Sequence, residues 1–218
     1  MEVTINYKFV HKSKRYSQKC EVSKIEFMYT SEKGKKEILG LYNQKLEELN
    51  INYKYQLIDT SFGVTNLIIT GNASKPPIIL VHGSNGCAPI ALETYKGLEN
   101  DFQIFAIDVL AQPNKSADTR LSMKNDDYGK WMHEVIDALK LKNVTLAGFS
   151  FGGLIILKTL EYSEKNIKEV FLTANALKPT FKKSLFGCKN SIVALNLFLW
   201  FTCPGVLGFA TLEGLILI

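Results

Sequence analysis

The spacing of apolar positions changes along the chain, and each spacing predicts a different kind of element. In residues 34–50, apolar side chains recur every three or four positions with lysine and glutamate between them, which predicts an amphipathic helix. Two short runs follow at residues 53–60 and 64–70, separated by S-F-G. This pattern predicts two strands joined by a tight turn.

Further along, short and continuously apolar runs are bounded by turn residues. Such runs are typical of strands that are buried on both faces of a parallel sheet. They occupy residues 78–81, 104–107, 144–147 and 170–172.

A second amphipathic helix is predicted between the second and third of these runs. Its apolar positions fall at spacings 0, 3, 4, 7, 8 and 11 from Tyr128 to Leu139. Asp126 and Asp127 precede them, where the helix dipole favours negative charge. Because strands alternate with helices here, we expect an α/β fold with a mostly parallel, doubly wound sheet.

Composition places the chain among ordinary globular proteins. Hydrophobic residues make up 46% and charged residues 22% of the chain, and the formal net charge is +5. The positive charge is scattered, which is too dilute for a surface that binds nucleic acid. The first thirty residues lack the apolar core of a secretory signal, so we expect a cytoplasmic protein.

Cysteine usage gives no sign of a metal site or a disulfide framework. Cys20, Cys87, Cys188 and Cys203 are far apart and form no C-x-x-C pair. We therefore expect neither a metal nor another cofactor.

The strongest chemical signal is L-A-G-F-S-F-G-G at residues 146–153, where an apolar run leads through G-x-S-x-G into a helical run. A sharp turn from strand to helix exposes the central serine, and its neighbours must be small for strand and helix to pass closely. This pattern predicts Ser150 as a nucleophile, with Gly148 and Gly152 as the small neighbours.

An earlier apolar run ends in V-H-G-S-N-G-C at residues 81–87. A loop at a strand end can present a backbone N–H to a tetrahedral intermediate. We expect Ser84 to be the first donor and Phe151, which follows the nucleophile, to be the second. Gly83 allows the tight turn, and His82 is expected to order the loop rather than to take part in catalysis.

Four blocks in this order resemble the α/β-hydrolase superfamily, and within it the carboxylesterase-like enzymes, over about residues 36–178. They are I-I-L-V-H-G-S-N-G, F-A-I-D-V-L-A-Q-P-N-K-S, D-Y-G-K-W-M-H-E-V-I-D-A-L and G-F-S-F-G-G. The resemblance implies cleavage of small-molecule esters through an acyl-enzyme at the serine. It also implies a structural role for Asp108 at a strand end.

Complete members of that superfamily carry an acid and then a histidine after the nucleophile, and this sequence departs from them there. The histidines are His11, His82 and His133, all before Ser150, and the only acid after Leu172 is Glu213. His133 is expected to face solvent from the second amphipathic helix. We therefore expect no complete triad and no turnover from these 218 residues.

The last part of the chain is apolar, and residues 190–212 contain no charged side chain. This length could cross a bilayer or contact lipid, but P-G interrupts it, and residues 192–201 are equally typical of a buried or cap helix. We expect a basic segment at residues 1–33, a partial hydrolase core at 34–178 and a partial cap or apolar tail at 179–218. The sheet would then end at the strand at 170–172.

Three functions remain open from the sequence. The first is a serine esterase whose acid and histidine are absent from this chain through truncation, a frameshift or true loss. The second is a non-catalytic module that binds ligands in the same pocket. The third is a membrane-associated protein that contacts lipid through residues 190–212.

Overall fold

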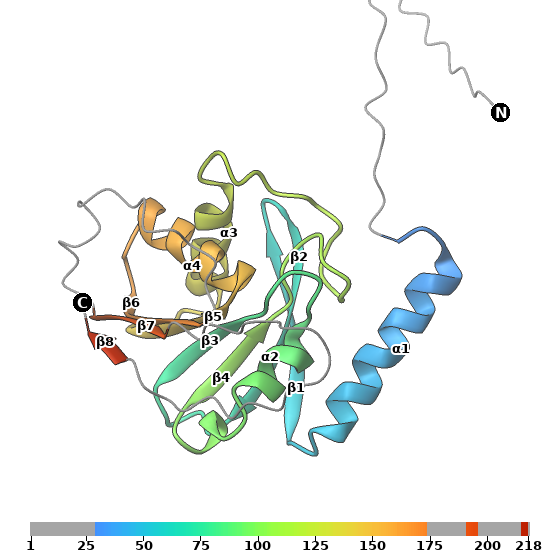
Figure 1. Ribbon diagram of the computed structural model, residues 1–218, viewed down its shortest axis with the longest axis horizontal. Helices are drawn as coiled ribbons and strands as arrows, with labels where there is room; N and C mark the ends of the chain where they lie inside the picture. The colour runs from blue at the N-terminus through green and yellow to red at the C-terminus, as the bar shows by residue number, and fades with distance from the viewer. Residues whose placement is uncertain (1–28, 174–190, 196–214, 218) are drawn as a thin grey trace, which may run out of the picture.

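The computed structural model describes residues 29–173, together with the backbone of residues 191–195 and 215–217 (Figure 1). Within these residues, the helices are α1 (Glu32–Glu48), α2 (Ala88–Thr94), η1 (Leu98–Asn100), α3 (Asp127–Ala138) and α4 (Phe151–Tyr162). The strands are β1 (Tyr53–Thr60), β2 (Gly63–Gly71), β3 (Pro77–Val81), β4 (Gln103–Ile107), β5 (Val144–Phe149), β6 (Ile167–Thr173), β7 (Ser191–Leu195) and β8 (Leu215–Leu217).

The strands of the described residues form one sheet in the order β1-β2-β4-β3-β5-β6-β7-β8. Strands β4, β3, β5, β6 and β7 pair in parallel. The other pairings, β1 with β2, β2 with β4 and β7 with β8, are antiparallel. The predicted α/β fold with a mostly parallel sheet is therefore confirmed.

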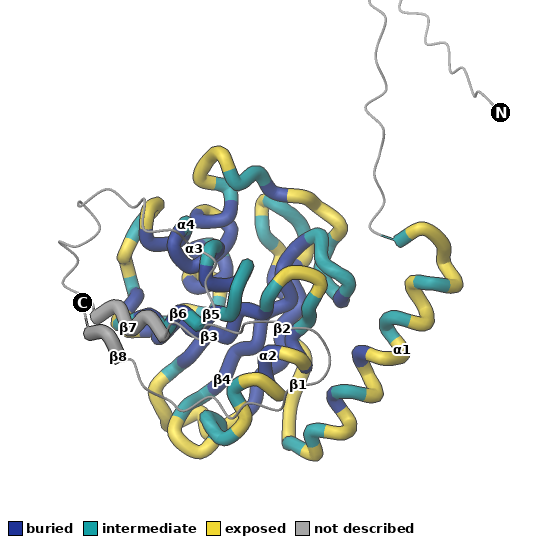
Figure 2. The backbone as a smooth tube through the Cα atoms, viewed as in Figure 1, coloured by how far each residue is buried: buried dark blue, intermediate teal, exposed yellow. Residues whose placement is uncertain are grey.

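Both faces of the central strands are buried, which explains their unbroken apolar runs. On β3, Ile79 and Val81 pack into the cluster formed with α3 and α4. Ile78 and Leu80, which point to the opposite face, pack into the cluster formed with α1 and α2. Figure 2 shows this buried centre, with the exposed residues gathered in α1, in the turns and on the edge strand β1.

Helix α1 confirms the predicted amphipathic helix and begins at a capped end. Ser31 accepts a hydrogen bond from the backbone N–H of Gly34 at 3.0 Å, which satisfies one of the free donors of the first turn. Tyr42 and Leu46 are buried against the core, whereas most of the helix is exposed (Figure 2). This helix therefore covers the edge of the domain near β2.

Strands β1 and β2 form the predicted hairpin, in which Thr60 is paired with Gly63. Gly63 has a φ of 120°, a conformation that L side chains rarely adopt. The turn is tied to α3, because the backbone N–H and hydroxyl of Ser61 donate to the carboxylate of Glu134 at 2.7 and 2.6 Å. These contacts fix the turn of the hairpin against α3.

Two predictions about the end of the sheet are wrong. Strand β6 is not its last strand, because β7 pairs with it in parallel from Glu169↔Ser191 to Thr173↔Leu195. The helix predicted over residues 192–201 is replaced by strand at 192–195. An apolar run of this length is compatible with a strand or a helix. It forms a strand here because β6 offers an edge with unpaired backbone groups to which it can hydrogen-bond.

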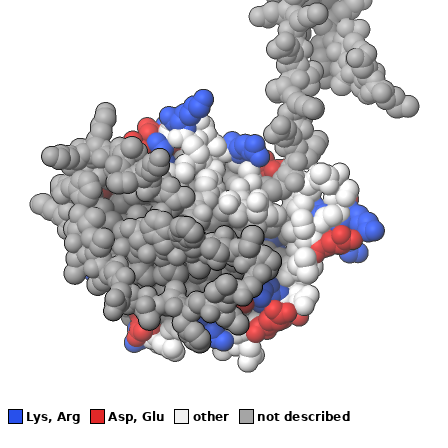
Figure 3. Space-filling view, in the orientation of Figure 1, with Lys and Arg blue, Asp and Glu red and all other residues white. Residues whose placement is uncertain are grey.

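The rest of the run at 190–212 lies outside the described residues, as do residues 1–28 of the basic segment predicted at 1–33. Among the helices of the described part, none combines the length and the apolar character that crossing a bilayer requires. On the face seen in Figure 3, the lysine and arginine groups of the described residues lie near acidic groups, with uncharged surface between these clusters. The described part of this face therefore has mixed charge.

Candidate active site

Ser150 occupies a strained turn between a strand and a helix. Strand β5 ends at Phe149 and α4 begins at Phe151, so Ser150 alone joins them, with φ of 51° and ψ of −112°. A non-glycine residue in such a region costs about 1–3 kcal/mol and is retained where the surroundings fix it. Here the N–H of Ser150 donates to the carbonyl oxygen of Thr173 on β6 at 3.0 Å.

The glycines beside Ser150 allow the close approach that the turn requires. A Cβ added at Gly148 would lie 2.6 Å from the carbonyl carbon of Gly152. A Cβ added at Gly152 would overlap the carbonyl oxygen of Val81 and lie 2.7 Å from that of His82. Because these neighbours are backbone atoms, a side chain at either position would force strand and helix apart.

The loop after β3 lies against this turn. A Cβ at Gly83 would be 3.0 Å from the ring of Phe149, the residue before Ser150. The loop closes on itself through a hydrogen bond of 3.2 Å from the N–H of Gly86 to the carbonyl oxygen of Gly83. Ser84 is exposed between them. The structure thus brings the predicted oxyanion loop and nucleophile turn together.

His82 is buried beneath this loop, and both ring nitrogens have partners. Nδ1 donates to the carbonyl oxygen of Gly83 at 2.7 Å, so Nε2 is the acceptor of the N–H of Val109 at 3.0 Å. The side chain of Asn114 approaches Nε2 at 3.3 Å. Burial lowers the pKa of His82 to about 4. These contacts support the predicted ordering role.

Asp108 holds the other end of the loop. It is buried, and one carboxylate oxygen accepts the N–H of Ala88, the first residue of α2, at 2.7 Å. The other oxygen accepts hydrogen bonds from Tyr42 at 3.0 Å and Asn66 at 2.8 Å. Burial raises the pKa of Asp108, and these donors oppose the rise. Its partners are structural, in line with the role that the family resemblance implies.

The prediction that His133 faces solvent is wrong, since its side chain is only 7% exposed. Its Nε2 donates to the carbonyl oxygen of Ser163 at 2.8 Å, and its ring lies 5.5 Å from that of Tyr162. Both partners belong to the end of α4, which packs against α3. The periodicity of α3 could not reveal this neighbour.

Neither described histidine is available to activate Ser150. His82 uses both ring nitrogens in the loop. His133 lies beside Ser163, and the twelve residues of α4 separate that end from Ser150 by about 18 Å. A general base must approach within about 3 Å of the hydroxyl. The third histidine, His11, lies outside the described residues.

Two residues that position the site carry little or no sequence signal. Thr173 contributes through its backbone carbonyl to Ser150, which any residue could supply. Asn114 donates to the carbonyl oxygen of Val109 at 2.9 Å, and so fixes the chain that His82 contacts. Its place after Q-P in a polar turn was the only available hint.

Within the described part of the chain, no three histidine, cysteine, aspartate or glutamate side chains gather in a way that could hold a metal ion.

The strand-turn-helix at Ser150, with the loop after β3 beside it, is the arrangement of an α/β protein with a sharp turn between a central strand and a helix. A family model described as "alpha/beta hydrolase fold" matches residues 76–201, more than half of the chain. The chain therefore belongs to the α/β-hydrolase fold family. The carboxylesterase-like resemblance is supported by similar proteins.

Two curated relatives come from Bacillus subtilis (strain 168). The uncharacterized carboxylesterase nap is 27% identical over 135 residues, which cover 62% of this chain and 45% of that protein. Carboxylesterase YbfK is also 27% identical over 135 residues, covering 62% and 46%. The chain thus spans about half the length of the curated relatives it matches.

Solved structures give the same result. Carboxylesterase CesB (YbfK) from Bacillus subtilis superposes with a TM-score of 0.60 at 26% identity, over 65% of this chain and 50% of that one. Naproxen esterase (carboxylesterase NP) from Bacillus subtilis gives 0.61 at 26% identity, over 68% and 52%.

Proposed function

We propose that this chain is the nucleophile-bearing part of a serine hydrolase that cleaves carboxylic esters through an acyl-enzyme at Ser150. The observation that carries the proposal is the backbone of Ser150, which adopts φ 51° and ψ −112° between β5 and α4. Strain of this kind is kept where a side chain must be presented to a reactant. The similarity to carboxylesterases supports esters as the substrate class.

In this mechanism the hydroxyl of Ser150 attacks the ester carbonyl and forms a tetrahedral intermediate. The backbone N–H groups of Ser84 and Phe151 stabilise its oxyanion, and the N-terminal end of α4 adds a favourable dipole. Collapse of the intermediate expels the alcohol, and water then releases the acid from the acyl-enzyme.

The proton of Ser150 needs a base, and the acid and histidine that complete the triad are proposed to come from outside residues 1–218. The supporting facts are that no histidine follows Ser150 and that His82 and His133 are committed to structural partners. Without a base, only the oxyanion loop and substrate binding would contribute to the rate.

Because the hydrogen bonds of His82 and His133 go to structural partners, a second candidate is also favoured. It is a module that binds esters without cleaving them. The two functions differ in their response to a fluorophosphonate probe, which reacts with activated serines. The comparison needs residues 1–218 and the natural protein with every residue that its gene encodes beyond Ile218.

If the natural protein is labelled and cleaves an ester, Ser150→Ala should abolish both, whereas Ser84→Ala should leave both unchanged because it keeps the backbone N–H. Absence of labelling in the folded natural protein would reject the hydrolase. Saturable ester binding without labelling in either form would favour the binding module.

Contact with lipid through residues 190–212 stays a prediction, because most of that run lies outside the described residues. Flotation with liposomes tests it. If residues 1–218 and a form ending at Pro179 float equally, the tail has no role in membrane contact.

A further inference from the structure

A chain of hydrogen bonds joins the end of α2 to the nucleophile turn. Tyr95 directly follows α2, and its hydroxyl oxygen lies 2.9 Å from Oγ1 of Thr173, the last residue of β6. The hydroxyl of Thr173 donates in turn to the carbonyl oxygen of Gly148 on β5, in a longer hydrogen bond of 3.4 Å. Because a threonine hydroxyl has one proton, Thr173 accepts the proton of Tyr95.

Thr173 therefore contacts the nucleophile turn on both sides of Phe149. Its hydroxyl bonds the carbonyl of Gly148, and its own carbonyl oxygen accepts the N–H of Ser150 at 3.0 Å. The positive φ of Ser150 is costly and persists only where surrounding contacts fix it. Two of these contacts come from the single residue Thr173.

The bond between the two hydroxyls lies in apolar surroundings. Tyr95 and Thr173 line a cavity of about 240 Å³, and the other residues that line it are all apolar: Ile78, Leu98, Phe102, Ala147 and Phe171. Burial raises the pKa of Tyr95, so its hydroxyl keeps its proton at neutral pH. Loss of either hydroxyl would leave the other without this partner.

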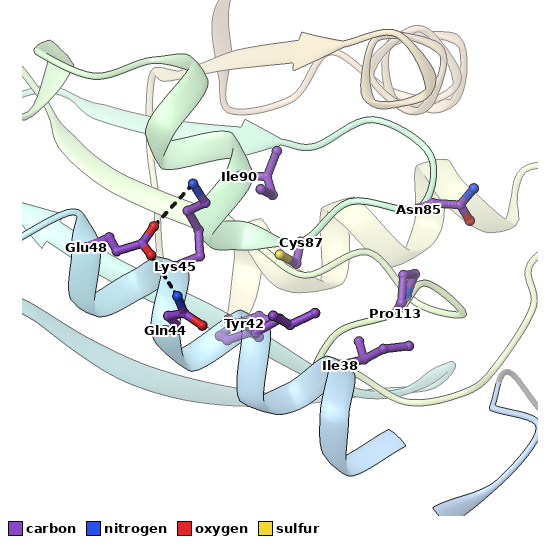
Figure 4. Close-up of a pocket in the computed structure, with 10 residues that line it drawn as sticks. Ile38, Tyr42, Gln44, Lys45, Glu48, Asn85, Cys87, Ile90 and Pro113 are labelled. Atoms are coloured by element: carbon purple, nitrogen blue, oxygen red, sulfur yellow. Dashed lines mark hydrogen bonds and ion pairs between the residues drawn. The ribbon is translucent and has the colours of Figure 1, made fainter. Parts of the chain in front are cut away.

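Helix α2 is fixed at its start and near its end, and this also fixes Tyr95. The N–H of Ala88 donates to the carboxylate of Asp108 at 2.7 Å. Glu93 accepts a hydrogen bond of 3.0 Å from Lys45 of α1, which Figure 4 shows beside the groove between the two helices. Since α2 begins directly after the loop proposed to bind the oxyanion, the bond from Tyr95 connects the helix of that loop with the nucleophile turn.

We propose that Tyr95 and Thr173 are positioning residues for Ser150. The hydroxyl of Tyr95 orients the side chain of Thr173, and Thr173 holds the backbone on both sides of Phe149, so that the hydroxyl of Ser150 points at the ester carbonyl. The inference rests on the proposed function for the reaction, whereas the contacts with the turn can be tested without it.

Amide hydrogen exchange of Ser150, followed by NMR in the natural protein, tests the contacts. Thr173→Val keeps the shape of the side chain and the backbone carbonyl but removes the hydroxyl. The turn should then open more often, and the Ser150 amide should exchange about tenfold faster. Tyr95→Phe should accelerate exchange about threefold. Thr173→Ser keeps the hydroxyl and should exchange like the unchanged protein.

The same variants should alter the reaction rather than the binding of the ester. A displacement of about 1 Å in a reacting group can cost about 10²-fold in rate. For cleavage of p-nitrophenyl acetate, Thr173→Val should lower kcat about tenfold and leave KM within about twofold of the unchanged protein. Thr173→Ser should retain the rate.

The two residues should act as a unit. Tyr95→Phe alone should lower kcat about threefold. Added to Thr173→Val, it should lower kcat no further, because the hydroxyl that Tyr95 orients is already absent. A further threefold loss in the double variant would show that Tyr95 does not act through Thr173.

Thr145→Val is the matched control. The hydroxyl of Thr145 on β5 donates to the carboxylate of Glu169 on β6 at 3.2 Å, so this change removes a hydroxyl bond between the same two strands, away from the turn. It should lower stability in urea unfolding. Exchange of the Ser150 amide and kcat per folded molecule should stay unchanged.

Unchanged exchange of Ser150 in folded Thr173→Val, or equal acceleration by Thr145→Val, would overturn the proposed contacts. Faster exchange with an unchanged kcat would overturn the positioning role. If Thr173→Val does not fold, Tyr95→Phe gives both readouts, since it removes one oxygen from a half-buried ring. Expected exchange in a natural protein that a fluorophosphonate does not label would reject the proposed function and leave the contacts with the turn standing.

Discussion

His133 donates a hydrogen bond of 2.8 Å to the carbonyl oxygen of Ser163, at the end of α4 opposite Ser150. The bond joins α3 to α4 and keeps the imidazole away from the nucleophile. His133 therefore stabilises the packing of α4, the helix that begins directly after Ser150.

Replacing His133 by phenylalanine should reduce stability and leave chemistry at Ser150 intact. The variant keeps an aromatic ring but removes the N–H, so the half-buried carbonyl of Ser163 loses its partner, which costs about 1 kcal/mol. Urea unfolding should show this decrease in the free energy of unfolding. Fluorophosphonate labelling of the natural protein, per folded molecule, should match the unchanged protein. Loss of labelling in a folded variant would contradict the structural role.

A pair of glycine substitutions tests the packing at the elbow. Gly152→Ala should destabilise the fold by about 1–3 kcal/mol or more, because the added Cβ meets the backbone oxygens of Val81 and His82. Gly40→Ala is the control, since its Cβ on exposed α1 would have no heavy atom within 4 Å. It should stabilise the helix by about 0.5–1 kcal/mol. Equal effects of the two changes in urea unfolding would show that the elbow is not tightly packed.

The elbow could be predicted from sequence because its determinants are local. Gly148, Ser150 and Gly152 lie within five positions, and their geometry follows from the junction of β5 with α4. The apolar runs likewise predicted the central strands, because burial on both faces leaves a continuous signal.

The errors concern partners that are distant in sequence. The periodicity of α3 assigned His133 to a polar flank, but Tyr162 and Ser163 cover that flank. The apolar run at 192–195 became β7 because β6 offered it an edge, which no local pattern records. The carbonyl of Thr173 was missed for the same reason, since a backbone acceptor leaves no residue preference.

Acidification should destabilise the fold through His82. Its pKa is about 4 in the folded protein and about 6.5 when unfolded, so the unfolded chain binds the proton more readily. The contribution of neutral His82 to the free energy of unfolding is complete above about pH 6.5. It decreases by about 3 kcal/mol as the pH falls to about 4.

Asp108 acts in the opposite direction, because its raised pKa makes the folded state the better proton acceptor at that group. Comparison with His82→Gln isolates the histidine. The difference in unfolding free energy between the two proteins should shrink as pH falls through this window. An NMR titration in which the His82 ring becomes charged near pH 6.5 would refute the prediction.

The assignment of Ser84 as an oxyanion donor predicts that its backbone matters and its side chain does not. In the natural protein, Ser84→Pro removes the N–H and should lower the rate of ester cleavage about 10²–10³-fold, the usual effect of losing one such donor. Ser84→Ala keeps the N–H and should retain the rate. Because Ser84 is exposed, neither change removes a buried side chain. Urea unfolding should show similar stabilities for the two variants, so that the rates report the donor rather than the fold. Equal rates for the proline and alanine variants would show that the first oxyanion donor is another N–H of the loop and not that of Ser84.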